Sequence, residues 1–180
     1  MAVQRVEELV RKVAAALEAA NVPYALIGGN AVAAWVSTVD AEAVRATKDV
    51  DILLRRADLA TASRALAPLN LIPVELLGVH MFVDRDHQSP KSGVHVVVAN
   101  ELIRPHYQHP APDPDQGVRV AEFRILSLAA LVAMKLESYR DIDRAHVRDL
   151  SNVGLITEEL IRQLPDDLRA KLQALLSAPE

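Results

Sequence analysis

The chain has 180 residues, a net charge of −4 and an apolar fraction of 51% with few aromatic residues. This length suits one domain, or one domain with a small helical appendage, and its core must be built from Leu, Val, Ile and Ala. The absence of cysteine excludes disulfide frameworks and thiolate zinc sites, and the negative charge argues against non-specific DNA binding, which depends on Lys and Arg.

The N-terminal segment predicts an amphipathic helix. Apolar residues recur at helical spacing over residues 3–17 with charged residues between them, unlike the unbroken apolar core of a secretory signal. The longest apolar stretch, residues 126–134, is far too short to span a bilayer. We therefore expect a soluble, cytoplasmic protein without a membrane partner.

A short apolar strand, a glycine turn and a helix of small residues come next. Residues 24–27 predict the strand and residues 31–36 the helix, with Gly28, Gly29 and Asn30 between them. Glycines let a backbone approach a bulky anion at a helix N-terminus, so this turn predicts a phosphate contact. The alternatives are a tight strand-to-helix turn for the glycines and a helix cap for Asn30.

An acidic strand follows over residues 49–54, after a polar connection. Side chains alternate along a strand, so Asp49 and Asp51 share one face while Val50 and Ile52 share the other. Neighbouring carboxylates repel each other unless a cation lies between them, and Mg²⁺ is commonly held by one or two carboxylates with substrate phosphates. With the glycine turn, the pair predicts a metal-assisted nucleotide site; the alternative is two solvated carboxylates.

The middle of the chain predicts one helix, a region of strand-like periodicity from residue 71 to residue 99, and a loop. The predicted bounds are 59–66 for the helix and 81–83, 94–98 and 118–125 for strands. The proline-rich residues 104–117 predict a surface loop that exposes His106 and His109. Asp84 and Asp86 repeat the spacing of the acidic pair, but their turn-like surroundings assign them to a hairpin.

From Ser127, a suitable N-cap, the chain is predicted to be helical to its end. The predicted helices cover residues 128–139, 144–152, 158–163 and 167–176. This change divides the chain into an α/β part, residues 1–126, and a helical region, residues 127–180, packed on it; a single domain is the alternative. The predicted fold is α/β (α+β), a small mixed sheet flanked by helices with a C-terminal helical bundle.

For the charged residues in these helices, the sequence allows either a functional or a structural interpretation. Lys135 interrupts an apolar helix, where a buried ammonium needs an anion; a lysine at the helix edge is the alternative. Three further residues, spaced by three, could share a helix face and form a metal cluster; they are Asp143, His146 and Asp149. The arginines between them favour ion pairing instead. Three arginines recur every four residues and form either a phosphate-binding stripe or a solvated helix face. They are Arg140, Arg144 and Arg148.

The order of the glycine turn and the acidic strand resembles the nucleotidyltransferase superfamily that shares the DNA polymerase β catalytic fold. That family carries hG[G/S] at a helix start, [D/E]h[D/E] on the next strand and a third acid on a later strand. Residues 26–54, which read LIGGNAVAAW…RATKDVDILL, match the first two elements. Residues 128–155 are similar to the lysine-bearing helix and KD-type segment of minimal bacterial members related to the AbiEii toxin.

The resemblance implies roles for individual residues. The implied nucleotide-binding residues are Gly28, Gly29, Asn30 and Lys135. The implied catalytic residues and metal ligands are Asp49 and Asp51, with Mg²⁺ or Mn²⁺ as cofactor and an NTP as substrate. The third acid is missing: His95 stands in its place as a possible catalytic auxiliary, and Glu101 is a conceivable substitute. Ile142 replaces the lysine of the KD pair.

The implied activity is metal-dependent transfer of a nucleoside monophosphate from an NTP to a hydroxyl of RNA, protein or a small molecule, with a toxin–antitoxin setting as one option. The missing third carboxylate supports a second hypothesis, a catalytically degenerate relative that binds a nucleotide or a protein and regulates it. A third, purely structural hypothesis predicts that NTP with Mg²⁺ leaves the melting temperature unchanged.

Overall fold

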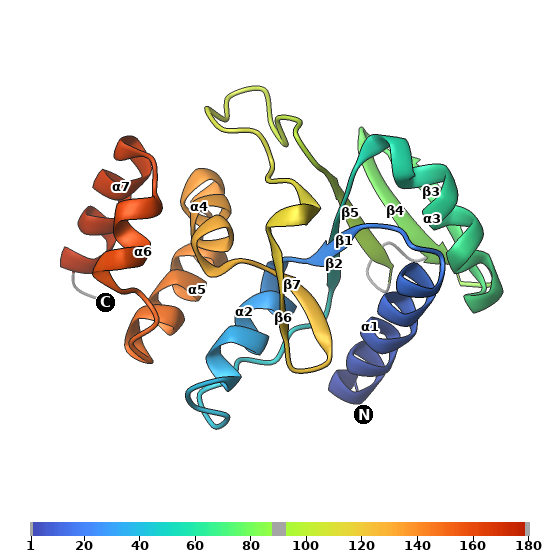
Figure 1. Cartoon of the computed structure of the whole chain (residues 1–180), viewed down its shortest axis with the longest axis horizontal. Coiled ribbons are helices and arrows are strands. Elements are labelled where there is room, and N and C mark those ends of the chain that lie inside the picture. The colour runs from blue at the N-terminus through green and yellow to red at the C-terminus, as the bar shows by residue number, and fades with distance from the viewer. Residues whose placement is uncertain (1, 88–92, 179–180) are drawn as a thin grey trace.

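The computed structural model of the chain describes residues 2–87 and 93–178 (Figure 1). Its helices are α1 (Ala2–Ala19), α2 (Gly28–Ser37), α3 (Leu59–Leu66), α4 (Leu128–Ser138), α5 (Asp141–Asn152), α6 (Glu158–Gln163) and α7 (Asp166–Ser177). Its strands are β1 (Tyr24–Leu26), β2 (Val50–Leu54), β3 (Leu71–Leu76), β4 (Val79–Asp84), β5 (Val94–Val98), β6 (Gly117–Val120) and β7 (Phe123–Leu126). The predicted α/β (α+β) class is confirmed.

Within the described residues, the strands form one mixed sheet of seven strands in the order β3-β4-β5-β2-β1-β7-β6. β1 pairs antiparallel with β2 and parallel with β7, and β2 pairs parallel with β5. Leu26, Ile52 and Leu54 on the two central strands are at most 1% exposed. Strands covered on both faces carry continuous apolar runs, which explains why the acidic segment turns apolar after Asp51.

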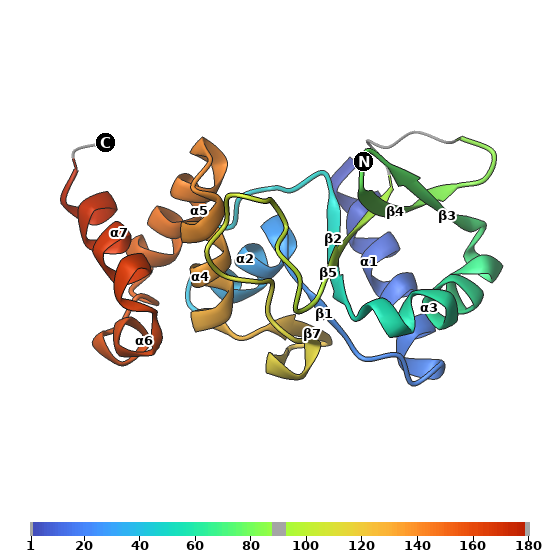
Figure 2. The ribbon, with the colours of Figure 1, turned by 90° about the horizontal axis from the view of Figure 1, so that it is seen from above.

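Helices cover both faces of this sheet (Figures 1 and 2). α1 and α3 lie against one face, and α2 lies against the other with α4 and α5 beyond it. α6 and α7 pack on α4 and form the end of the molecule opposite α1. One hydrophobic core includes buried residues from all of these layers, among them Leu17, Leu54, Leu131 and Leu168. The C-terminal helices therefore share the core of the sheet.

Every predicted helix is present, with ends that shift by no more than three residues. Two of the shifts concern the candidate site. α2 begins at Gly28, so the glycines form its first turn, and α5 begins at Asp141, earlier than expected. Ser127 takes the N-cap position of α4 as predicted, but its side chain makes no capping hydrogen bond.

The predicted single strand over residues 118–125 is wrong. The structure has a hairpin there, with β6 and β7 paired antiparallel and Val120 opposite Phe123. The chain reverses at Ala121, which adopts the left-handed conformation with φ +51°. A tight hairpin is usually marked by Gly, Asn or Asp at such positions, and the turn here carries alanine and glutamate instead. The sequence therefore hides the reversal.

Two loop predictions have different outcomes. Asp84 ends β4 and its carboxylate accepts hydrogen bonds from the backbone of Asp86 and His87, which confirms a turn; residues 88–92 of that segment lie outside the described residues. His106 is exposed as predicted. His109 is not simply exposed, because its ring lies 3.0 Å from a carboxylate oxygen of Asp167 on α7.

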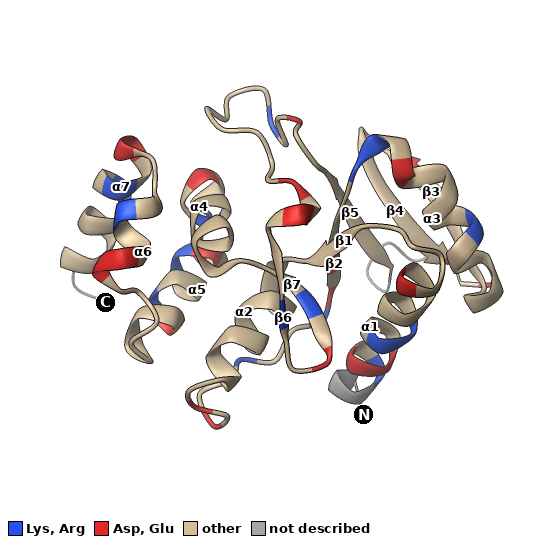
Figure 3. Ribbon diagram, viewed as in Figure 1, with Lys and Arg blue, Asp and Glu red and all other residues tan. Residues whose placement is uncertain are grey.

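Charge and hydropathy are distributed without long uniform segments. Among the described residues, no helix combines the length and the apolar character that crossing a bilayer requires. α5, α6 and α7 each carry two acidic residues in the first turn and basic residues further along (Figure 3). These three helices therefore offer no uninterrupted basic segment to a nucleic acid backbone.

Candidate active site

The glycine turn and the acidic strand meet because β1 and β2 run antiparallel. Leu26 pairs with Ile52, and the backbone N–H of Ile27 donates to the carbonyl of Asp51 over 3.0 Å. Gly28 follows with a positive φ of +66°, and a Cβ built on it would lie 2.0 Å from Oδ2 of Asp51. Position 28 thus has no room for a side chain while the Asp51 carboxylate lies there.

Asp49 lies one residue before β2 and is held from the side of α2. The side-chain amide of Asn30 donates to the backbone carbonyl of Asp49 over 2.6 Å. Val50 and Ile52 are fully buried, whereas Asp49 is exposed and Asp51 half-buried, which agrees with the alternation predicted for the strand. Asn30 does not cap α2, whose N-cap is Ile27; it ties the helix to the acidic segment.

His95 lies directly beside Asp51. β5 runs parallel to β2 with His95 in register with Asp51, and Nδ1 of the ring is 3.5 Å from Oδ1 of the carboxylate. Glu101 lies beyond the opposite end of β5, where it pairs with Arg56 over 2.6 Å. Glu101 is therefore not placed to substitute for the third carboxylate, and the neighbouring strand offers Asp51 an imidazole.

The predicted phosphate-binding lysine has a partner within the chain. The Lys135 ammonium donates to Asp143 over 2.8 Å, and both side chains are at most 8% exposed. Arg140 donates to the same carboxylate over 2.7 Å, and Ser138 is a further donor. Burial alone would raise the pKa of Asp143, but the bonds from Arg140, Lys135 and Ser138 outweigh burial and lower that pKa to about 2.

Arg140 is the exposed member of this network. Its hydrogen bond to Asp143 is the main cause of its raised pKa, and attraction to Tyr107 and Asp51 contributes as well. The Arg140 side chain is 69% exposed, so its positive charge is accessible to solvent. The predicted stripe placed Arg140 on a helix; the structure places it at the N-cap of α5.

The other two members of that stripe serve different contacts. Arg144 pairs with Asp141, and Arg148 donates to the backbone carbonyl of Ala178. The three arginines therefore have different partners, and Arg140 alone belongs to the buried network around Asp143. Its sequence signal was weak: an arginine three residues before an acid, at a helix start.

The ion-pairing alternative for the acids of α5 is confirmed, with different partners from those expected. Asp143 pairs with Lys135 and Arg140, and Asp149 pairs with Arg45 over 2.9 Å, so neither uses the interleaved arginines. The two acids are occupied by separate cations. They do not form a shared metal cluster with the histidine between them.

That histidine, His146, packs on the glycine turn instead. It is 8% exposed, and its Nδ1 atom is buried without a hydrogen-bond partner among the described residues. A Cβ on Gly29 would lie 3.7 Å from Cε1 of His146 and 2.8 Å from the hydroxyl of Thr47. Burial, and then the charge of Lys135, lower the pKa of His146 to about 4, so the ring is neutral at pH 7.

No family model matches the chain, and no curated protein matches its sequence. Solved structures do match. The solution structure of the antibiotic-resistance factor ANT(2'')-Ia superposes with a TM-score of 0.60 at 16% identity over 98% of this chain and 95% of that one.

Two further structures agree with the first. ANT(2'')-Ia in complex with adenylyl-2''-tobramycin gives a TM-score of 0.56 at 18% identity over 94% of this chain and 98% of that one. An antigenic nucleotidyltransferase-like protein from Paracoccidioides brasiliensis gives 0.61 at 18% identity over 96% and 88% of the two chains. With the glycine turn against the acidic strand, these matches show that the chain has the nucleotidyltransferase fold.

Proposed function

We propose that this protein is a metal-dependent nucleotidyltransferase that moves a nucleoside monophosphate from an NTP to an acceptor hydroxyl. The observation that carries the proposal is the close approach of Gly28 to Asp51, 2.0 Å from a would-be Cβ to the carboxylate. In this fold, that approach puts a helix N-terminus suited to phosphate next to a pair of carboxylates suited to a cation. Neither feature alone would support the same chemistry.

Asp49 and Asp51 are the residues that would hold the metal. Carboxylate oxygens are the ligands that Mg²⁺ and Mn²⁺ prefer, and the bare backbone of Gly28 leaves the Asp51 carboxylate room at the turn. When bound, the ion would align the acceptor hydroxyl with the α-phosphate and stabilise the leaving pyrophosphate. His95, with Nδ1 3.5 Å from Oδ1 of Asp51, orients that carboxylate.

The triphosphate contacts come from α2 and from Arg140. The amides of Gly28 and Gly29 open the first turn of α2, where backbone N–H groups and the helix dipole favour an anion. Arg140 adds an exposed guanidinium that is attracted to Asp51. Lys135 contributes through Asp143, which its ammonium holds in the position that binds Arg140. Asn30 contributes by fixing the backbone of Asp49.

The acceptor class is open among RNA, protein and small molecules. One structural neighbour was solved with an adenylylated aminoglycoside, which makes aminoglycosides the small molecules to test first. A toxin–antitoxin role predicts that expression of the chain alone arrests growth. His95 in place of the third carboxylate favours the second candidate function, a nucleotide-binding relative without turnover.

Pyrophosphate release tests the proposal. The protein is incubated with each labelled NTP, Mg²⁺ or Mn²⁺, and separate pools of RNA, protein and aminoglycosides. We expect release with one pool, reduced at least about 100-fold in Asp51→Asn because a metal ligand is lost. Asp86→Asn is the matched control, since Asp86 belongs to the other Asp-x-Asp pair and lies in a turn.

The melting temperature, measured with each NTP, separates the enzymatic function from nucleotide binding without turnover. If NTP with Mg²⁺ raises the melting temperature but no pool yields pyrophosphate, the binding function replaces the enzymatic one. If the melting temperature does not move with any NTP, both functions are excluded. An Asp51→Asn protein as active as the wild type would contradict the assignment of the site.

A further inference from the structure

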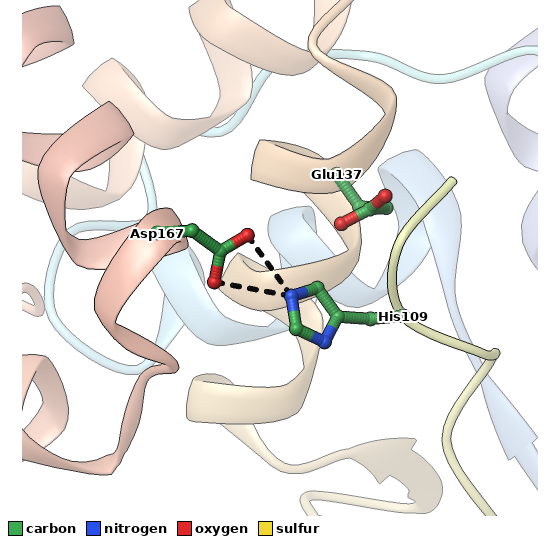
Figure 4. Close-up of side chains that lie close together, drawn as sticks. All are labelled: His109, Glu137 and Asp167. Atoms are coloured by element: carbon green, nitrogen blue, oxygen red, sulfur yellow. Dashed lines mark hydrogen bonds and ion pairs between the residues drawn. The ribbon is translucent and has the colours of Figure 1, made fainter. Parts of the chain in front are cut away.

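Three side chains from distant parts of the chain, none of them a candidate active-site residue, converge in the structure (Figure 4). They are His109 in the proline-rich loop, Glu137 in the last turn of α4 and Asp167 in the first turn of α7. One nitrogen or oxygen atom from each lies within 4.8 Å of the corresponding atoms of the other two. In Figure 4 the His109 ring points toward Asp167, and the Glu137 carboxylate lies beside this pair.

The histidine and the aspartate already have the separation of two ligands on one ion. Nε2 of His109 lies 3.0 Å and 3.1 Å from the two carboxylate oxygens of Asp167. Two ligand atoms of a tetrahedral zinc ion lie about 3.3 Å apart, given bond lengths near 2.0 Å. These two groups therefore need little movement to bind a common cation.

Glu137 supplies an observation that is independent of this spacing. Its Oε1 atom accepts the backbone N–H of Gln108 over 2.5 Å, but its Oε2 atom is buried and has no hydrogen-bond partner among the described residues. A buried carboxylate oxygen without a partner costs free energy, and such groups are normally satisfied by a donor or a cation. A cation bound jointly by the Glu137 carboxylate, His109 and Asp167 would compensate the charge of this partly unpaired carboxylate.

The donor set selects the kind of cation. Two carboxylates compensate a dication, and an imidazole ligand favours zinc and similar transition metals over Mg²⁺ or Ca²⁺, which take oxygen ligands. We propose that His109, Glu137 and Asp167 form a zinc-type metal site, with solvent completing the coordination. The ion would fasten the proline-rich loop to α4 and α7. This site shares no residue with the candidate active site and does not depend on the proposed function.

Without a metal, the same residues make a weaker contact. The side chains of His109 and Asp167 are 36% and 52% exposed, and ion pairs between exposed side chains add little to stability. Zinc binding and a plain surface ion pair therefore predict different responses to added metal. Only the metal site predicts a melting temperature that rises with zinc concentration and falls again with chelator.

The test uses the full chain carrying Asp49→Asn and Asp51→Asn, so that the candidate active site does not bind the added ion. After chelator treatment, Zn²⁺ is titrated by calorimetry, and Co²⁺ replaces it for absorption spectra. We expect one ion per chain, a tetrahedral cobalt spectrum and a zinc-dependent rise in melting temperature. His109→Ala should weaken binding at least about 100-fold, because one ligand of three is removed.

Two further variants keep the result interpretable. His106→Ala is the matched control, because His106 lies in the same loop, is exposed, and its ring packs edge-on against the neighbouring Tyr107 ring. Glu137→Gln preserves shape and the acceptor for Gln108 while removing the charged ligand, so it serves if His109→Ala loses its fold. The proposal is overturned if no zinc binds, or if zinc affinity is the same in His109→Ala and Glu137→Gln as in the parent.

Discussion

At the scale of single residues, three neighbours determine the surroundings of the Asp51 carboxylate. Gly28 leaves it space, His95 lies beside its carboxylate, and Arg140 provides positive charge nearby. These three residues come from α2, β5 and the start of α5, which are far apart in the chain. Gly28 is the least replaceable of them, because it must combine a positive φ with the absence of a side chain.

We therefore predict that Gly28→Ala destabilises the protein more than Gly78→Ala does. Both glycines have positive φ, +66° and +77°, but a Cβ at Gly78 meets nothing within 4 Å. The difference isolates the overlap with Asp51, and overpacking of this kind costs roughly 1–3 kcal/mol. Urea unfolding of the two variants measures it. Equal losses of stability would mean that Asp51 moves aside freely.

The NTP-dependent rise in melting temperature should shrink in Gly28→Ala and persist in Gly78→Ala. If the shift persists in Gly28→Ala as well, the glycine turn does not contact the triphosphate.

At the scale of elements, α5 concentrates buried ionisable groups behind the glycine turn. Asp143 and His146 lie on its buried side, one fully charged and paired, the other neutral. The helix thus positions Arg140 through Asp143 and closes the back of the turn through His146. Both groups are deprotonated at pH 7, but their lowered pKa values differ, about 2 for Asp143 and about 4 for His146, which gives α5 two separate pH windows.

The first window belongs to His146. Its pKa is lowered from 6.5 to about 4 on folding, so the unfolded chain binds more protons between these values. Stability should therefore fall as pH falls through that range, by about 2 kcal/mol between pH 7 and pH 5. Urea unfolding at both pH values checks this. His146→Gln should remove that part of the pH dependence, whereas His106→Gln, at an exposed position, should leave it unchanged.

Asp143 acts only at lower pH. Its pKa is lowered on folding to about 2, so its contribution is complete above its ordinary value of 3.8 and is lost as pH falls toward 2. The two groups can therefore be separated by pH. A His146→Gln protein that loses as much stability as the wild type between pH 7 and pH 5 would contradict the assignment to His146.

At the scale of the whole molecule, the C-terminal helices complete the fold. α4 and α5 pack on α2, and Leu131, Leu136, Val147 and Leu150 are fully buried in the core that includes the sheet. Trp35 of α2 donates to the backbone carbonyl of Leu126 over 3.0 Å, where the sheet gives way to α4. On the basis of these contacts we propose the single-domain alternative, in which the helical region folds together with the sheet.

We predict that a chain ending at Leu126 does not unfold cooperatively. Each fully buried leucine contributes about 1.5–3 kcal/mol, and a domain is stable by only about 5–15 kcal/mol, so loss of the α4 and α5 packing is comparable with the whole free energy of unfolding. Urea unfolding followed by circular dichroism measures this. A truncated chain with the midpoint and slope of the full chain would show two independent domains.

The sequence by itself determined the local elements and the chemical types at the site. Helical periodicity and alternation gave the helices and the central strands, because each depends on neighbours within a few residues. The glycine turn and the acidic pair were visible because both motifs are short. The β6–β7 reversal was not, because Ala121 carries no turn signal.

Only the tertiary structure decided which side chains meet. The pairing of β2 with β5 brought His95 to Asp51, and the packing of α4 on α5 gave Lys135 the anion that its burial requires. The convergence of His109, Glu137 and Asp167 likewise joins a loop to two helices. Such contacts depend on strand order and helix packing over the whole core, and no local pattern of residues encodes the distance between segments that far apart.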